Sequence, residues 1–206
     1  MDPIVYVVDD DNSVRQSLVR LLTAEDYRVA DFPSAKAFLS HAFRPEPGCL
    51  ILDMNMPDAD GFDVAESLTK LGYLIPVIFL TGFGTIPLSV KAMKAGAYEF
   101  MTKPAVPGLL LKAVADALTL AEKNIGASQE IQILTSRYES LTPREKEVFQ
   151  LAIGGLLNKQ IATAMSVSEI TAKVHKKRVM EKMEVRSLAD LVRCAERLNI
   201  VKSQSR

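Results

Sequence analysis

The chain has 206 residues, of which 48% are hydrophobic and 24% are charged, a balance that excludes a fibrous or disordered protein and is typical of a folded one. The net charge is zero, but residues 1–124 carry 16 acidic and 11 basic side chains, whereas residues 125–206 carry 9 and 14. The acidic front half and the basic rear half predict two domains with different partners, and nucleic acid is the candidate partner of the rear one.

The cysteines and the chain start indicate the compartment. Cys49 and Cys194 fall inside predicted elements and form no disulfide framework, as expected for core thiols in a reducing environment. The first residues lack the basic region of a signal peptide, and no apolar run is long enough to span a membrane. We therefore expect a cytoplasmic protein without a membrane partner.

The front half alternates apolar runs with amphipathic segments. Strands are predicted at residues 4–8, 27–30, 49–53, 75–80 and 98–101. Helices are predicted at 14–22 behind a cap at Asn12 or Ser13, at 34–42, 61–71 and 87–95, and from 107 onward. Five strands that alternate with five helices are the pattern of an α/β protein with a doubly wound parallel sheet. We expect the flavodoxin-like strand order 2-1-3-4-5.

The first and third predicted strands both end in aspartate. Asp9 and Asp10 follow residues 4–8, and Asp53 ends the run that starts at Cys49. In the order 2-1-3-4-5, these two strand ends flank the point where ligands bind. Asp53 by itself could simply cap the following turn. Three carboxylates in one crevice repel one another, however, and Mg²⁺ with open positions for phosphate is their natural partner.

Two further dipeptides, each with one polar residue, follow the fourth and fifth strands: Thr81-Gly82 and Lys103-Pro104. The carboxyl ends of parallel strands share one edge, so these residues should converge on the aspartates. Phosphoryl transfer onto Asp53 is a chemistry they could share, because a carboxylate can act as a nucleophile and form an acyl phosphate. Lys103 would neutralise charge, the Thr81 hydroxyl would contact the phosphoryl oxygens, and Gly82 would leave room. Pro104 also permits a cis bond that would aim Lys103 inward.

Four short motifs then carry a resemblance to a known family: Val-Val-Asp9-Asp10, Leu-Asp53-Met-Asn-Met-Pro57, Thr81-Gly82 and Lys103-Pro104. Residues 1–122 resemble the receiver domain of response regulators. The resemblance implies that Asp53 takes a phosphoryl group from a sensor histidine kinase. It also implies Mg²⁺ as cofactor and a switch pair near the phosphate. The implied metal site is Asp10, Asp53 and the Asn55 carbonyl, with Asp9 acting through water, and the implied switch pair is Thr81 and Phe100.

The chain departs from the receiver pattern at two positions. Ala105 follows Lys103-Pro104 where the family often has an aromatic residue, which bears on one packing contact near the site. Phe83 stands where FixJ-like members usually have histidine. We expect the apolar Phe83 side chain to hinder the approach of water and to slow the loss of phosphate from Asp53.

Residues 123–140 are predicted to link two domains. The segment contains one Gly and no Pro, and Ile131, Leu134 and Tyr138 recur at helical spacing. This favours a partly helical linker that continues the fifth helix. The alternative is a solvated polar tether.

The rear domain, residues 141–206, is predicted to be all-α with four helices. Thr142, Pro143 and Glu145 form a capping signature for a helix that runs to Ile153. Further helices are expected at residues 158–165, 168–183 and 187–198. The short helix, the tight turn at Ser166 and the longer helix are the helix-turn-helix arrangement, whose second helix enters the major groove of DNA.

The apolar positions of that second helix predict its orientation. The pattern assigns Ile170, Val174, Val179 and Met183 to packing and leaves Lys173, Lys176, Lys177 and Lys182 to solvent or phosphate. Motifs such as Leu141-Thr-x-Arg-Glu145 and Val174-His175 make this half similar to the LuxR-type (NarL/FixJ) DNA-binding domain. The resemblance implies base-edge contacts by Lys173, Val174 and Lys177, phosphate contacts by Lys159, Thr171, Lys176 and Arg178, and a phosphate or packing contact by His175.

Together these features predict a phosphorylation-controlled transcription factor and not an enzyme. Phosphate on Asp53 should promote a homodimer that binds double-stranded promoter DNA, and RNA polymerase is a further candidate partner. The expected dimer face comprises Val90, Lys91, Lys94 and Tyr98. Two alternatives remain open at this point: a Mg²⁺-dependent phosphatase with an aspartyl-phosphate intermediate, and a module that signals by docking without phosphate.

Overall fold

The computed structural model describes residues 2–200, and the chain divides into two compact units at Gly126 and Ala127. Residues 201–206, the end of the predicted DNA-binding domain, lie outside the described residues. Each unit has its own hydrophobic core and is described separately.

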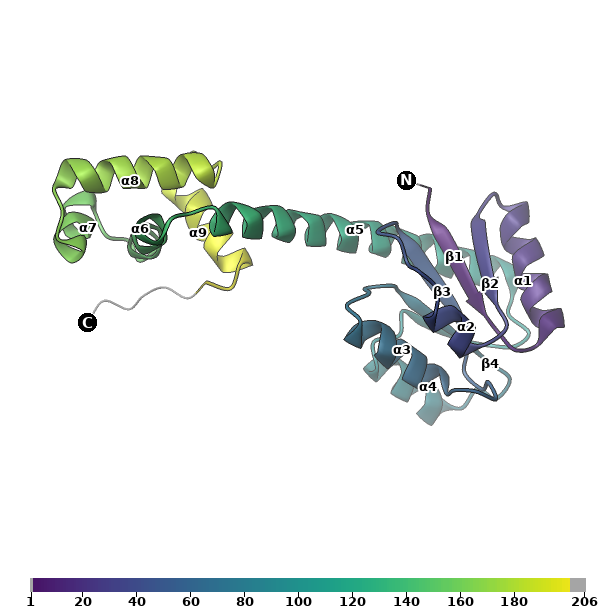
Figure 1. Cartoon of the computed structure of the whole chain (residues 1–206). Coiled ribbons are helices and arrows are strands. Elements are labelled where there is room, and N and C mark those ends of the chain that lie inside the picture. The colour runs from purple at the N-terminus through teal and green to yellow at the C-terminus, as the bar shows by residue number, and fades with distance from the viewer. Residues whose placement is uncertain (1, 201–206) are drawn as a thin grey trace. The chain divides into compact units, whose positions relative to one another are not determined.

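The first unit is built on a five-stranded parallel sheet (Figure 1). Its strands are β1 (Ile4–Val8), β2 (Arg28–Phe32), β3 (Gly48–Asp53), β4 (Val77–Thr81) and β5 (Glu99–Thr102). The strand order is β2-β1-β3-β4-β5, which confirms the predicted order. The register pairs Val8 with Leu52 and Thr81 with Thr102, so the polar strand ends reach the same edge of the sheet.

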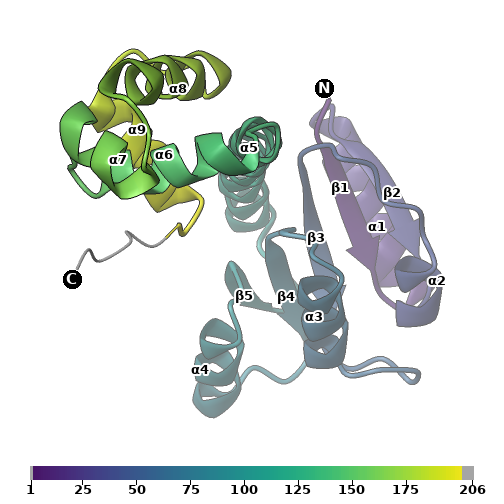
Figure 2. The same cartoon turned by 60° about the vertical axis from the view of Figure 1, so that its left-hand side comes forward.

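Helices cover both faces of this sheet (Figures 1 and 2). They are α1 (Asn12–Ala24), α2 (Ala35–Leu39), α3 (Gly61–Lys70), α4 (Ile86–Lys94) and α5 (Pro107–Glu139). Successive side chains of a strand point to opposite faces. Val5 and Val7 therefore pack with the apolar side chains of α1 and α5, whereas Tyr6 and Val8 pack with those of α2 and α3. The strands read as nearly continuous apolar runs because both faces are buried.

Several element ends differ from the prediction. The cap of α1 is Asp11, one residue earlier than expected, because its carboxylate accepts hydrogen bonds from the backbone N–H groups of Ser13 (2.8 Å) and Val14 (3.3 Å). The helix expected to reach residue 42 ends at Leu39. β4 extends to Thr81 because this residue still pairs with β5. The segment 123–139 is helical throughout, as part of α5.

The second unit consists of the end of α5 and the helices α6 (Pro143–Ile153), α7 (Asn158–Met165), α8 (Glu169–Lys182) and α9 (Leu188–Arg197). The capping signature is confirmed, since Thr142 and Glu145 form a reciprocal capping box with Pro143 in the first turn. Ser166 adopts a left-handed conformation (φ 55°) that ends α7, and the Ser168 side chain then caps α8. The predicted helix-turn-helix is therefore present. Across residues 2–200, no helix is long and apolar enough to cross a membrane.

Candidate functional site

Three carboxylates meet at the carboxyl ends of β1 and β3. Because Val8 pairs with Leu52, Asp9 and Asp53 leave the two neighbouring strands side by side. Carboxylate oxygens of Asp9, Asp10 and Asp53 all lie within 4.8 Å of one another. Asp9 and Asp53 are buried and Asp10 is exposed, so the cluster has one side open to solvent. The structure thus brings together the three predicted metal-site carboxylates.

Lys103 provides the positive charge of this cluster. It follows β5, and its Nζ lies 2.7 Å from Asp9 Oδ2 and 3.0 Å from Asp53 Oδ2. Burial raises the pKa of Asp9, although the Lys103 ammonium opposes the rise. Burial also lowers the pKa of Lys103, but its hydrogen bonds to Asp9 and Asp53 outweigh that effect and leave the pKa above its usual value. The Lys103–Pro104 peptide bond is cis, as the sequence permits.

The Thr81 hydroxyl lies at the end of β4 next to the carboxylates. It is fully buried and accepts hydrogen bonds from Asn55 Nδ2 (3.4 Å) and from the Phe83 backbone N–H (3.1 Å). The backbone N–H of Asn55 donates to Asp53 Oδ1 at 3.3 Å. A Cβ added at Gly82 would meet no other described atom within 4 Å, so this side of the site has open space. Hydrogen bonds through Asn55 therefore link the Thr81 hydroxyl to the Asp53 carboxylate.

Arg15 supports the acidic turn, and sequence reasoning missed it. This buried side chain on α1 donates to the Asp9 carbonyl oxygen (2.6 Å), to Asn12 Oδ1 (2.8 Å) and to Asp31 Oδ2 (3.0 Å). It thereby joins the end of β1 to β2. A basic residue one turn after an acidic run is the signal that could have identified it, because Arg can donate several hydrogen bonds in fixed directions.

Gly84 is a second residue that sequence reasoning missed. A Cβ at this position would lie 2.2 Å from Thr102 Cγ2, closer than any real contact, so another residue here would force the Thr102 side chain or the loop after β4 to shift. The same hypothetical Cβ lies 3.8 Å from the Phe100 ring. Phe100, the predicted switch residue, is partly buried against the core on the α2–α4 side. The Thr81 loop and Phe100 are therefore in close proximity.

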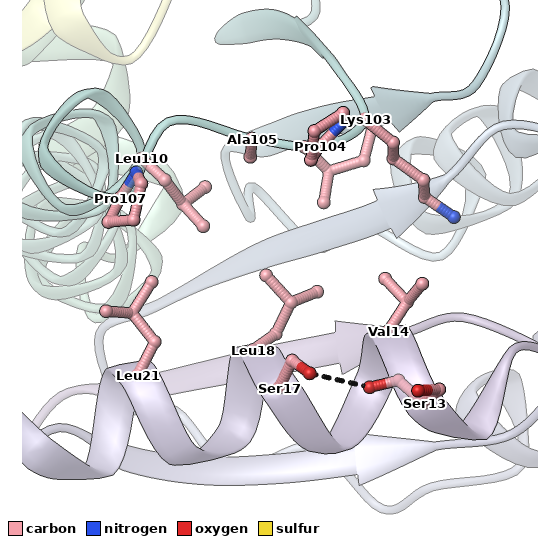
Figure 3. Close-up of a pocket in the computed structure, with 11 residues that line it drawn as sticks. Ser13, Val14, Ser17, Leu18, Leu21, Lys103, Pro104, Ala105, Pro107 and Leu110 are labelled. Carbon is pink, nitrogen blue, oxygen red and sulfur yellow. Dashed lines mark hydrogen bonds between the residues drawn. The ribbon is translucent and has the colours of Figure 1, made fainter.

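Two cavities adjoin the cluster. One of about 430 Å³ is lined by Asp10, Asn55, Pro57 and Asp60 and opens beside the exposed carboxylate. The other, of about 590 Å³, lies between α1 and the segment that follows β5 (Figure 3). In this second cavity Val14, Leu18 and Leu21 face Pro104 and Leu110, and Ala105 forms part of the wall. The small Ala105 side chain leaves this wall unfilled where a larger residue would project.

The donor set suits a hard divalent cation. Carboxylate oxygens are the ligands that Mg²⁺ prefers, and Mg²⁺ is usually bound through one or two carboxylates while it keeps several other positions open. Asp10 and Asp53 supply such carboxylates beside the 430 Å³ cavity, and Asp9 lies behind them. An acidic metal-binding pocket is therefore consistent with the geometry.

The residues predicted to contact DNA lie on two helices of the second unit. Lys159 is exposed in the first turn of α7, and all the others are on α8. Lys173, Lys177 and Arg178 are exposed, whereas Thr171, His175 and Lys176 are half-buried. Among the described residues, Nδ1 of His175 is buried without a hydrogen-bond partner, which favours a packing role for that edge of the ring.

Two expectations for α8 are wrong. Ile170 and Val174 do not pack in the core: they are 78% and 45% exposed, and the core-facing residues are Ala172, Val179 and Met183. The cause is that α8 carries apolar residues on two faces, so its periodicity does not identify the buried one. Lys182 is not left to solvent or phosphate, because its Nζ lies 2.6 Å from the buried Glu145 carboxylate.

The predicted dimer face lies on α4 and just before β5. Val90, Lys91 and Lys94 are exposed, and Tyr98 is half-buried. Lys91 Nζ lies 4.0 Å from the centre of the Phe62 ring, so this lysine already has an intramolecular cation–π contact.

Comparison with known proteins agrees with this geometry. Residues 5–115 match the response regulator receiver domain family, and residues 139–195 match the luxR family of bacterial regulatory proteins. The chain is 46% identical to the response regulator protein TmoT of Ectopseudomonas mendocina over 96% of this chain and 90% of TmoT. It is 38% identical to the transcriptional regulatory protein FixJ of Rhizobium meliloti over 94% of this chain and 95% of FixJ.

A solved structure also indicates a response regulator. The response regulator StyR matches with a TM-score of 0.82 at 45% identity, over 95% of this chain and 99% of that one. The two family matches and these full-length relatives agree with the acidic site and the helix-turn-helix of this chain. This chain belongs to the FixJ-like two-component response regulators, transcription regulators that combine a receiver domain with a LuxR-type DNA-binding domain.

Proposed function

We propose that Asp53 accepts a phosphoryl group from a sensor histidine kinase, and that the modified protein dimerises and binds promoter DNA. In this assignment the receiver comprises residues 1–122, the linker 123–140 and the DNA-binding domain 141–206. The observation that carries the proposal is the placement of Lys103 Nζ 3.0 Å from the buried Asp53 carboxylate, beside two further carboxylates.

The chemistry follows from this arrangement. An Asp53 oxygen attacks the phosphorus of phosphohistidine, an O–P bond forms, the N–P bond breaks, and the imidazole keeps the bonding electron pair. Bound by Asp10, Asp53 and the Asn55 carbonyl, with Asp9 behind them, Mg²⁺ would supply charge neutralisation on the phosphoryl oxygens. Lys103 supplies a second positive charge, and Thr81 can donate its hydroxyl hydrogen to a phosphoryl oxygen.

A connected switch is the second part of the proposal. The Thr81 hydroxyl now accepts two hydrogen bonds, one of them from the backbone of Phe83. Contact with phosphate would turn this hydroxyl toward Asp53. The loop after β4 would move with it, and through Gly84 this loop lies close to Phe100. Such a shift biases a two-state surface on α4 and β5, around Val90, Lys91, Lys94 and Tyr98, toward a dimer. The dimer then presents two copies of α8 to two half-sites.

The phosphatase alternative is not supported, because the family comprises transcription regulators and not catalytic enzymes.

The phosphorylation switch is tested by measuring the intact mass and the oligomeric state before and after incubation with Mg²⁺ and acetyl phosphate, and in parallel with beryllofluoride. We expect a phosphate adduct and a dimer in the wild type and neither in Asp53→Asn. Asp58→Asn, which changes an exposed carboxylate outside the cluster, is the matched control and should behave as the wild type. A dimer that forms equally in Asp53→Asn would contradict the proposal.

A further inference from the structure

The helix α8 exposes two aliphatic side chains on the face opposite its core contacts. Ile170, Lys173, Val174 and Lys177 follow one another at helical spacings of three and four residues, so they share one side of the helix. Ile170 is 78% exposed and Val174 is 45% exposed. These values make Ile170 one of the most exposed large apolar side chains of the second unit.

Local structure does not account for Ile170. The cap of α8 is made by Ser168, whose Oγ accepts a hydrogen bond from the Thr171 backbone N–H, and Ile170 takes no part in it. A β-branched residue also has a lower helix propensity than lysine or alanine. Leaving its side chain in water forgoes the free energy that burial would contribute. The Ile170 side chain is therefore available for a contact outside the unit.

The charges around Ile170 indicate what that partner is. Lys173 and Lys177 lie on the same face, and the Lys177 side chain is 78% exposed. Arg178, next along the helix, is also exposed. Cations on such a face are attracted to a DNA duplex, whose phosphates carry a high density of negative charge. The major groove offers one apolar group between those phosphates, the 5-methyl of thymine, and aliphatic side chains are suited to contact it.

We propose that Ile170 is a further specificity-determining residue: it contacts the 5-methyl group of a thymine in each half-site, beside a second thymine whose methyl group meets Val174, the residue already expected at a base edge. The inference rests on insertion of α8 into the major groove. The two residues are one helical turn apart, about 6 Å along the axis. Neighbouring base pairs are about 3.4 Å apart. The two thymines should therefore lie one or two base pairs from each other, beside the bases that Lys173 and Lys177 reach.

The experiment removes the methyl group from the DNA and its partner from the protein. The full-length protein, with beryllofluoride and Mg²⁺, selects duplexes from a random library, and each thymine of the selected site is then replaced by deoxyuridine. We expect one or two positions per half-site at which deoxyuridine weakens wild-type binding about threefold to fivefold, the effect of one buried methyl group. Ile170→Ala should bind the thymine and deoxyuridine duplexes equally at one of these positions, and Val174→Ala at the other.

Two controls separate this effect from a general loss. Lys176→Ala should weaken binding to both duplexes by the same factor. Leu157→Ala removes another exposed aliphatic side chain, from the residue before α7, and should keep the wild-type discrimination. Because Ile170 is outside the core, its truncation should leave the unfolding temperature unchanged, which a thermal melt verifies.

The outcomes distinguish this inference from the proposed function. Equal wild-type binding to thymine and deoxyuridine at every position, or a selected site without thymine, would overturn it while leaving sequence-specific binding intact. Full discrimination in Ile170→Ala would also overturn it. If the site is bound equally without beryllofluoride, the phosphorylation switch is wrong and the methyl contact stands.

Discussion

Lys182 Nζ lies 2.6 Å from the Glu145 carboxylate and joins α8 to the start of α6, although 37 residues separate the two in the chain. The same carboxylate accepts a hydrogen bond from the Thr142 backbone N–H at 2.9 Å, and the lysine also donates to the Ser140 carbonyl oxygen at 3.1 Å. Glu145 is buried, whereas Lys182 is partly exposed. This pair ties the end of α8 to the start of α6 within the second unit.

Glu145→Gln should destabilise the DNA-binding unit by about 1–3 kcal/mol, because it removes a charged hydrogen bond from a buried site. Hydrogen exchange of the full-length protein at neutral pH should show faster exchange in α6 and α8 and unchanged exchange in the sheet. The matched control is Glu147→Gln, whose carboxylate forms a surface pair with Arg144 and should cost less than about 1 kcal/mol. Equal effects of the two variants would contradict the assignment.

The same carboxylate makes the domain sensitive to acid. The Lys182 ammonium and the Thr142 N–H lower the pKa of Glu145 to about 2 from its usual value of 4.5. A lowered pKa in the folded state stabilises the protein above pH 4.5, and that contribution is lost as the pH falls from about 4.5 to about 2. The stability difference between wild type and Glu145→Gln should therefore shrink across this range. Circular dichroism melts at a series of pH values measure it, and a constant difference would contradict the prediction.

Arg15→Met should loosen the turn that carries Asp9 and Asp10. The variant keeps the apolar length of the side chain but loses the hydrogen bonds to the Asp9 carbonyl and to Asp31. We expect a loss of about 2–3 kcal/mol in unfolding free energy. In a double-mutant cycle, Asp31→Asn should add little to the destabilisation caused by Arg15→Met, because each variant removes the same Arg15–Asp31 ion pair.

Arg20→Met, an exposed arginine on the same helix, is the control for that cycle and should change stability by less than about 0.5 kcal/mol. Full additivity of Arg15→Met and Asp31→Asn would show that the guanidinium does not couple β1 to β2.

Lys103→Met should make the receiver more dependent on Mg²⁺ for stability. The variant leaves three carboxylates within 4.8 Å of one another without their ammonium partner. We expect the metal-free protein to lose about 1–3 kcal/mol and the metal to raise the melting temperature more than it does in the wild type. Lys112→Met, an exposed lysine on α5, should respond to Mg²⁺ as the wild type does. An unchanged Mg²⁺ response in Lys103→Met would argue against this charge balance.

Phe83→His should shorten the lifetime of the phosphorylated protein by roughly twofold to tenfold, the range of one hydrogen bond to an attacking water. Phe83 is 80% exposed and lies two residues after Thr81, whose hydroxyl accepts a hydrogen bond from the Phe83 backbone N–H. Loss of radiolabelled phosphate from Asp53 gives the rate. Ile86→His places an imidazole at another exposed position of the same loop and helix start and should leave the rate unchanged. Matching rates for wild type and Phe83→His would contradict this role.

The sequence was sufficient for the sheet and its acidic edge. The apolar runs that end in Asp9, Asp53, Thr81 and Lys103 identified the strand ends, and parallel strands must bring such ends to one edge. Thr142 with Pro143 and Glu145 likewise identified the start of α6. In each case the determining interactions are local, or follow from the rules of strand order, so the order of residues contains the information.

Only the tertiary structure decided which side of α8 faces the core and which residues pair across the fold. Ile170 and Val179 are equally apolar in the sequence, yet the first is exposed and the second is buried, because α6 and α7 cover one side of the helix and not the other. In the sequence Lys182 is indistinguishable from a surface lysine, and only the fold places it against Glu145. A contact between residues far apart along the chain depends on how the intervening helices turn and pack, and no local pattern of residue types contains that geometry.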